Sequence, residues 1–351
     1  MFLFDSSGQV AIDNSYITKI AEKFLNLNPV IVRTKVFLPA QKNNPGTTLW
    51  DLSKKINNSL PFIKAYYAGV ISKWINESEN SVVAGNEDDF FFKVLFRLRN
   101  KQTKIVVYEE ESLFPELTEL LKNNMEAVFN SEYLEQRAKD FLKNRITDNQ
   151  LLNHLHVIAP PFAIPPKPVI YRNEQLECIY FGSELPAQRA SLLESTAKKM
   201  LQKPIAVHFS IIGKVDYVID KTGLTNCTFY GDIRDPEKLK AIISKADTLM
   251  ITSKTGNIPR GLLEMFAMGK PVISTTVGAV PDYIKDGVNG YLIPENKIES
   301  KMMEDYIIAL SIIGADRITL IEIAQRNHKK ANELLNEQLF IKKWKEIIPP
   351  Y

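Results

Sequence analysis

The sequence has few of the residues on which several common kinds of site depend. Among its 351 residues only two are cysteines, Cys178 and Cys227, and both lie in apolar, strand-like runs. We therefore expect reduced core residues and no disulfide scaffold. The four histidines show no metal-site spacing, and His154 and His156 are interpreted as packing or hinge residues. The net charge of +3 is too small to indicate a nucleic-acid partner.

Long apolar runs are also absent. No run approaches the roughly 20 residues that a membrane span requires. The first residues, MFLFDSSGQV, have neither the basic start nor the apolar length of a signal peptide. No internal repeat or low-complexity segment occurs. We expect a cytoplasmic protein, and the length favours two domains of about 150–200 residues each.

Proline marks the expected domain boundary. The segment Ala159–Pro168 holds five prolines in ten residues, and proline fixes φ and donates no backbone hydrogen bond. We interpret it as a stiff linker. The predicted parts are an N-terminal domain (1–160), the linker (161–170), a C-terminal domain (171–335) and a final segment (336–351).

Strand-like runs separated by helical stretches occur on both sides of this linker. Many are continuously apolar, as buried parallel strands are. This pattern predicts an α/β protein with two Rossmann-like doubly wound domains facing a central cleft. It does not by itself separate the possible double-Rossmann proteins, periplasmic binding proteins among them. The predicted strands are Phe2–Phe4, Val30–Leu38, Ser81–Ala84, Lys104–Tyr108, Ala127–Asn130, His156–Ala159, Glu177–Phe181, Val207–Ile212, Cys227–Tyr230, Thr248–Thr252, Val272–Thr275 and Tyr291–Ile293.

The most informative stretch is Met250–Pro294, MITSKTGNIPRGLLEMFAMGKPVISTTVGAVPDYIKDGVNGYLIP. Pro259-Arg260-Gly261 opens a short helix that presents Glu264, and Gly269-Lys270-Pro271 ends that helix before a buried strand. Gly278-Ala279-Val280-Pro281 begins a second short helix, and an Asp-Gly-Val-Asn-Gly turn precedes the last strand. The alternation of strand, loop and helix predicts parallel-sheet architecture, whose loops at the strand ends bind ligands.

This stretch closely resembles the nucleotide-sugar half of GT-B glycosyltransferases of group 1 (family 4, retaining). The resemblance implies transfer of a sugar from a nucleotide diphosphate donor to a hydroxyl acceptor, with no cofactor or protein-bound metal. It also implies that the last helix, predicted over Ile318–Ile347, packs on the N-terminal domain, which would be the acceptor domain. An ordinary surface helix with an apolar stripe is the alternative.

In the resembled family, two glutamates separated by seven residues serve the donor. The second, which contacts the ribose hydroxyls, corresponds to Glu264. The first, near the donor sugar, corresponds to Gly256, so that carboxylate is missing. A charged hydrogen bond contributes about 1.5–3 kcal/mol, and its loss should weaken or change donor selection. Asn257 is a neutral candidate for the same contact.

The family's diphosphate-binding Arg and Lys follow the first strand of the second domain. Here Ser183 replaces the Arg, and Arg189 is the better candidate for the Lys, since a guanidinium can hold two phosphate oxygens. Lys254 and Arg260 could supply further positive charge at a helix N-terminus. Solvated surface charge is the alternative for both. Ser253, Gly182, Gly261, Gly278 and Ala279 complete the predicted donor-binding set.

The N-terminal domain offers weaker candidates. Relatives often have a cleft histidine at a strand end, whereas this chain has Glu109, Glu110 and Glu111. Glu109 or Glu110 could act on an acceptor hydroxyl as a general base. Alternatively, these glutamates form the solvated acidic start of a helix. Glu87-Asp88-Asp89 is interpreted as another acidic helix start and not as a metal site.

The run Phe90–Lys104 has five basic residues, no acidic one and an apolar helical face. It packs against a sheet with its cations outward, or it contacts an anionic membrane from the cytoplasmic side. The acceptor is unidentified, and a lipid-linked molecule is one candidate. Three functions remain open: an active glycosyltransferase in bacterial-type glycan or glycolipid synthesis, a catalytically degenerate GT-B protein that binds a glycan or partner enzyme, and another GT-B activity such as an epimerase or phosphorylase.

Overall fold

The computed structural model describes residues 1–5, 19–20, 23–24, 29–33, 48–51, 61–78, 81–86, 88–99, 103–109, 114–170, 175–182, 189–215, 218–233, 235–254 and 260–348. The chain forms two compact units. One comprises Met1–Pro161 with Gln338–Tyr351, and the other comprises Phe162–Glu337. The boundaries predicted from sequence lie at residues 160, 170 and 335.

The first unit is built on a parallel sheet. Its described strands are ordered β3-β2-β1-β4-β5-β6-β7, and every pairing between them is parallel. The strands are β1 (Phe2–Asp5), β2 (Val30–Arg33), β3 (Thr48–Asp51), β4 (Val82–Asn86), β5 (Thr103–Tyr108), β6 (Glu126–Phe129) and β7 (Leu155–Val157). All except β3 overlap predicted strands. The sequence of β3, TLWD, has no continuous apolar run, so the pattern did not reveal it. The predicted continuation of β2 to Leu38 lies outside the described residues.

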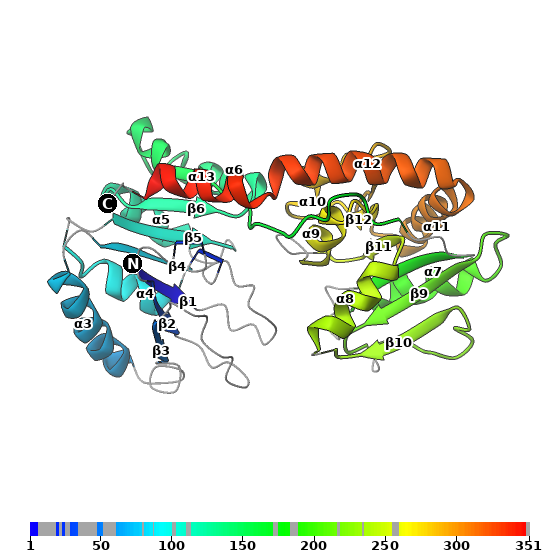
Figure 1. The fold of residues 1–351 in the computed structure, drawn as a ribbon, viewed down its shortest axis with the longest axis horizontal. Helices are drawn as coiled ribbons and strands as arrows, with labels where there is room; N and C mark the ends of the chain where they lie inside the picture. The colour runs from blue at the N-terminus through cyan, green and yellow to red at the C-terminus, as the bar shows by residue number, and fades with distance from the viewer. Residues whose placement is uncertain are drawn as a thin grey trace. The chain divides into compact units, whose positions relative to one another are not determined.

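Helices pack on both faces of this sheet (Figure 1). They are α3 (Pro61–Glu77), α4 (Asp89–Leu95), α5 (Phe114–Lys122), α6 (Glu132–Leu142) and α13 (Glu337–Ile347), with a 3-10 turn at Asn149–His154. Alternate residues of a strand point to opposite faces. Accordingly, Val83 and Val106 join one core with α3 to α6, while Val82 and Ile105 join another with α13.

The run Phe90–Lys104 is not one helix, contrary to the prediction. Asp88 caps α4 by accepting hydrogen bonds from the backbone N–H groups of Phe90 (2.9 Å) and Phe91 (3.3 Å). The helix ends at Leu95, and Lys104 lies buried in β5, where its Nζ donates to the Leu98 carbonyl at 3.1 Å. The phenylalanines of α4 are buried in the core. The packing interpretation is therefore correct for them, and an aromatic membrane-binding face on this helix is wrong.

The predicted C-terminal helix is divided in two. Helix α12 (Arg317–Leu334) ends where the carbonyl of buried Leu335 accepts a hydrogen bond from the Phe162 N–H at 2.9 Å. Helix α13 then places Phe340 and Trp344 against Leu3 and the neighbouring strands, and Trp344 is fully buried. The expected packing of the last helix on the N-terminal domain is confirmed.

The second unit has a parallel sheet of its own. Its described strands are ordered β10-β9-β8-β11-β12-β13. They are β8 (Leu176–Phe181), β9 (Val207–Ile212), β10 (Cys227–Gly231), β11 (Thr248–Ile251), β12 (Val272–Thr275) and β13 (Tyr291–Ile293). The helices are α7 (Ala190–Met200), α8 (Pro236–Lys245), α9 (Arg260–Ala267), α10 (Val280–Tyr283), α11 (Glu299–Ala315) and α12. The prediction of two doubly wound α/β units is confirmed.

The Pro-rich segment lacks regular secondary structure, as predicted, but it is anchored to the second unit. The Pro165 carbonyl contacts His328 Nε2 of α12 at 2.7 Å, and the Val169 N–H donates to the Met268 carbonyl at 2.9 Å. Pro168 lies beside Gly269. The part of the segment from Phe162 onward therefore packs along this unit. Among the described helices, none combines the length and apolar character needed to cross a membrane.

Candidate functional site

The second unit has a topological switch point between β8 and β11. From β8 the chain moves outward to β9 and β10, and it then returns to the other side of β8 to form β11, β12 and β13. In open sheets of this type, ligands bind in the crevice at the carboxyl ends of the two strands flanking the switch. Here those ends lead into Gly182 after β8 and into Thr252 to Lys254 after β11.

Glycines allow close backbone approach at these strand ends. A Cβ on Gly261, in the first turn of α9, would lie 2.6 Å from two carbons of the Phe181 ring. A Cβ on Gly213, which follows β9 with φ of 109°, would lie 2.0 Å from the Gly182 carbonyl oxygen. Any larger residue would therefore displace α9 or separate the ends of β8 and β9. Gly213 was not among the residues predicted from sequence, although a glycine directly after a strand is a recognisable signal.

Buried hydroxyls fix the carboxyl end of β11. Tyr180 Oη and Thr252 Oγ1 lie 3.0 Å apart, Tyr306 Oη donates to the Ile251 carbonyl, and Thr275 Oγ1 donates to the Ser253 carbonyl at 2.6 Å. Burial raises the pKa of Tyr180, so the phenol stays protonated as a hydrogen-bonding group. These bonds join β8, β12 and α11 to one strand end. The loop that follows β11 thus starts from a rigid base, and Ser253 is itself buried.

Glu264 lies one turn after the start of α9 and is half-buried. Lys254 is exposed at the end of the described part of the preceding loop. Arg260 is the first residue of α9, but its side chain lies outside the described part of the structure, as do Gly256, Asn257 and Ser183. The backbone therefore places Glu264 and Arg260 on the same short helix beside the switch point, at a helix start that favours anions.

Gly278 and Ala279 lie in the loop between β12 and α10, at the same edge of the sheet. Gly278 has φ of 49°, a left-handed conformation that glycine adopts most easily. Ala279 occupies the N-cap position of α10 and is fully buried. The predicted donor-binding residues Gly182, Ser253, Gly261, Gly278 and Ala279 are thus gathered at the carboxyl edge of the sheet. Their contact with a donor stays a prediction.

Arg189 has a more constrained setting than a surface phosphate ligand would have. It precedes α7 with φ of 47°, and its side chain is 2% exposed. The guanidinium forms an ion pair with Glu295, and its Nη1 lies 3.0 Å from Met302 Sδ. Arg189 therefore ties the start of α7 to the segment after β13 and to α11. Its role as a diphosphate ligand stays a prediction, and these contacts favour a structural role.

Part of the recognisable motif serves the scaffold. Lys270 is buried, and its Nζ donates to carbonyls at the end of α8, including that of Ser244 at 2.6 Å. Burial lowers its pKa to about 8. Asn289 Nδ2 donates to Asn327 Oδ1 at 2.8 Å, and Asn327 Nδ2 donates to the Lys270 carbonyl at 3.0 Å. The Gly-Lys-Pro and Asn-Gly elements therefore join β12, the turn before β13 and α12.

In the first unit, Glu109 follows β5 and accepts a hydrogen bond from Asn86 Nδ2 at 2.6 Å. Glu110 lies outside the described residues, and a general-base role for either glutamate stays a prediction. The histidines contact carboxylates or a carbonyl: His154 and His156 share Glu126, His208 contacts Glu177, and His328 contacts Pro165. Among the residues that the structure describes, no cluster of three or more histidine, cysteine or acidic side chains is arranged to hold a metal.

The two parallel sheets and the glycine-lined switch point define a double-Rossmann protein with a nucleotide-binding type of edge in its second unit. A family model described as "Glycosyl transferases group 1" matches residues 177–311. The second unit therefore contains a group 1 glycosyltransferase domain, as the resemblance implied.

The whole chain shares the GT-B fold with solved structures. Sucrose-phosphate synthase from Thermosynechococcus elongatus aligns with a TM-score of 0.75 and 14% identity, over 99% of this chain and 97% of that one. Anabaena Alr3699/HepE, solved in complex with UDP, aligns with a TM-score of 0.69 and 14% identity, over 98% of each chain. At these identities the likeness shows the fold alone.

Among curated proteins, the putative colanic acid biosynthesis glycosyltransferase WcaL of Escherichia coli K12 is 23% identical over 186 residues. That stretch is 50% of this chain and 45% of the relative. The chain thus spans about half the length of this relative. Distant relatives with names from bacterial polysaccharide synthesis are consistent with the group 1 domain.

Proposed function

We propose that this protein is a retaining glycosyltransferase that moves a sugar from a nucleotide diphosphate donor to a hydroxyl acceptor in bacterial-type glycan or glycolipid synthesis. The observation that carries the proposal is the placement of Glu264 on α9, beside the β8–β11 switch point, inside the group 1 domain. The UDP named in the structure of the Anabaena protein supports a uridine nucleotide as the first donor to test.

The residues divide by role in this proposal. Glu264 accepts hydrogen bonds from the ribose hydroxyls, while Lys254 and Arg260 offset the charge of the departing diphosphate together with N–H groups at the start of α9. Gly182 and Gly261 let the backbone approach the donor. Asn257 replaces the missing carboxylate near the sugar. Arg189 keeps its place as a secondary phosphate candidate.

Calorimetric titration with UDP tests the site. Glu264→Ala should lose a charged hydrogen-bonding group. This loss should weaken UDP binding by about 1.5–3 kcal/mol and leave the secondary structure unchanged. Glu304→Ala, at an exposed position on α11, is the matched control and should leave UDP affinity unchanged. Unchanged affinity in Glu264→Ala, in a protein that does bind UDP, would contradict the ribose assignment.

Gly256 and Ser183 stand where the family has charged donor ligands, and this observation favours a second candidate, a non-catalytic GT-B protein that binds a glycan or partner enzyme. The two candidates differ in donor turnover. An enzyme binds a nucleotide sugar and releases the nucleotide diphosphate when an acceptor is added. A thermal-shift screen of nucleotide sugars, followed by assay of the released diphosphate, separates them.

A further inference from the structure

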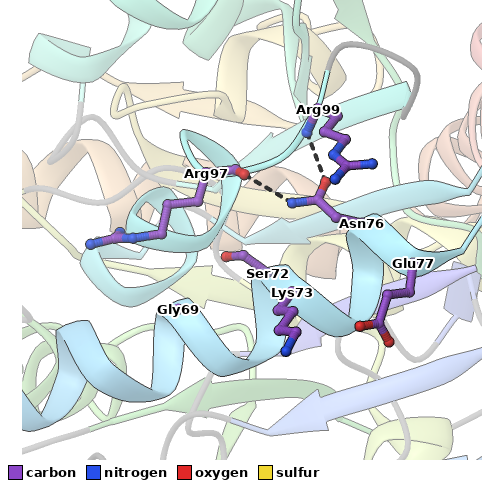
Figure 2. Close-up of a pocket in the computed structure, with 7 residues that line it drawn as sticks. All are labelled: Gly69, Ser72, Lys73, Asn76, Glu77, Arg97 and Arg99. Carbon is purple, nitrogen blue, oxygen red and sulfur yellow. Dashed lines mark hydrogen bonds between the residues drawn. The ribbon is translucent and has the colours of Figure 1, made fainter.

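A hollow in the first unit lies between α3 and the turn after α4. Its volume is about 480 Å³, and residues of α3 and of that turn line it (Figure 2). We call it the α3 hollow. It is lined by Gly69, Ser72, Lys73, Asn76, Glu77, Arg97 and Arg99.

Asn76 fixes the two walls of the α3 hollow relative to each other. Its Nδ2 donates to the Arg97 carbonyl at 3.1 Å, and its Oδ1 accepts from the Arg99 N–H at 2.8 Å. The single amide thus binds the backbone on both sides of Leu98, whose own side chain is buried in the core. Figure 2 shows the side chains of Arg97 and Arg99 leaving the turn on either side of Asn76, with Lys73 on α3.

Gly69 keeps the hollow open. It lies within helix α3, where glycine is less favourable than alanine, and a Cβ at this position would meet no atom within 4 Å. Packing therefore does not require glycine here. Ser72, one turn along the wall, is buried and directs its hydroxyl to the carbonyls of Ala68 (2.6 Å) and Val94 (3.3 Å), so it joins α3 to α4.

Positive charge dominates the rim. Lys73, Arg97 and Arg99 are exposed, against one exposed carboxylate, Glu77. Within the described part of the chain, none of these four side chains forms an ion pair. Lys93, by contrast, pairs with Asp89 one turn away. The rim thus presents three cations and one carboxylate to solvent.

An apolar stripe continues from the hollow along α3. Phe62 and Tyr66 are each 68% exposed. With Gly69 and Lys73 they follow the spacing of 4, 3 and 4 residues that places side chains on one helical face. Exposed aromatic rings next to cations are typical of surfaces that lie in the interface of an anionic membrane.

We propose that the α3 hollow binds the phosphate group of an anionic phospholipid, with Lys73, Arg97 and Arg99 around the phosphate and with Phe62 and Tyr66 in contact with the apolar part. Arg97 and Arg99 belong to the run Phe90–Lys104, for which membrane contact was one of the two interpretations of the sequence. Its aromatic partners come from α3 and not from α4. This site does not depend on donor chemistry, so its failure would leave the proposed transferase activity untouched.

The test is co-sedimentation of the full chain with vesicles containing phosphatidylglycerol, compared with vesicles of phosphatidylcholine alone. Binding should require the anionic lipid and weaken as salt rises. The triple variant Lys73→Gln, Arg97→Gln, Arg99→Gln should lose about fivefold in affinity per cation, or about 100-fold in all. The matched control is Lys122→Gln, Lys143→Gln, Lys345→Gln, at exposed positions of the same unit, and it should lose much less.

A second variant separates a built site from general attraction. Gly69→Gln changes no charge and meets no atom at its Cβ, but its side chain occupies the hollow, so vesicle binding should fall about tenfold or more while the fold is retained. Unchanged binding in Gly69→Gln, or equal losses in the two triple variants, would overturn the proposal. So would calorimetric binding of glycerol phosphate without any vesicle association, because the site would then serve a soluble phosphate.

Discussion

The ion pair between Arg189 and Glu295 makes an asymmetric prediction about stability. The Arg189 side chain is 2% exposed, whereas that of Glu295 is 55% exposed. Removing the carboxylate leaves a buried guanidinium without its charged partner, while removing the guanidinium leaves a carboxylate that water can solvate. Breaking a fully buried pair costs about 3–5 kcal/mol. Since solvent reaches Glu295, we expect about 2 kcal/mol for Glu295→Ala and less than about 1 kcal/mol for Arg189→Met, which retains the apolar stem.

The chain offers a matched control. Glu322 is 54% exposed and pairs with Arg326, but that arginine is itself 50% exposed. Glu322→Ala should therefore cost no more than about 0.5 kcal/mol, the usual value for a surface pair. The double variant Arg189→Met, Glu295→Ala should recover most of the loss seen in Glu295→Ala, because no buried charge is left unpaired.

Urea unfolding followed by circular dichroism measures these differences. All three tryptophans, Trp50, Trp74 and Trp344, lie outside Phe162–Glu337, so tryptophan fluorescence reports the first unit and serves as an internal reference. Binding of UDP and of uridine is measured on the same proteins. A large loss of UDP affinity but not of uridine affinity in Arg189→Met, with unchanged stability in Glu295→Ala, would refute the structural interpretation and support Arg189 as a phosphate ligand.

Three further changes test the scaffold around the site. Gly213→Ala should cost about 3 kcal/mol by thermal unfolding, through positive φ and the clash with the Gly182 carbonyl, whereas Gly223→Ala, with φ of 76° but no atom within 4 Å, should cost only about 1 kcal/mol. Trp344→Ala should cost about 3–5 kcal/mol, and equal stability to the parent would contradict its place in the core. The unfolded chain keeps the Lys270 proton up to about pH 10.5 and the folded chain loses it above about pH 8. The free energy of unfolding should therefore rise between these pH values, by up to about 3 kcal/mol, and Lys270→Met should flatten that rise.

Strands were the most predictable part of the fold. The predicted spans Val207–Ile212, Val272–Thr275 and Tyr291–Ile293 coincide with β9, β12 and β13. Each carries apolar residues, and glycine or proline lies directly before or directly after it, so composition and turn residues point to the same element. Helix boundaries depend on distant partners instead. At the break before α13, the Leu335 carbonyl accepts a hydrogen bond from the Phe162 N–H. Phe162 is distant in the sequence, so the residues around Leu335 could not reveal this contact.

The site residues show the same difference between local features, which the sequence predicts, and contacts with distant residues, which it does not. The motif placed Gly261 and Glu264 beside the switch point because strand ends and helix starts are local features. The setting of Arg189 was not predictable, since its partner Glu295 lies 106 residues away and the burial of the pair depends on α11. The sequence also could not show that Lys270 serves α8. A lysine in a conspicuous motif invites a ligand-binding role, but three carbonyls at the end of α8 accept its hydrogen bonds.

In the second unit, the hydrogen bonds that fix the strand ends come from residues other than the predicted charged donor ligands. The hydroxyls of Tyr180, Thr275 and Tyr306 form hydrogen bonds to the end of β11. The hydrogen bond between Asn289 and Asn327 fixes the turn before β13. In the resembled family, charged donor ligands correspond to Ser183 and Gly256, which follow these strand ends in the sequence. Under the proposed function, a substitution such as Gly256 for glutamate would alter the contact with the donor and leave these hydrogen bonds in place. Under the same proposal, substitutions at these positions would change donor choice while the sheet edge keeps its structure.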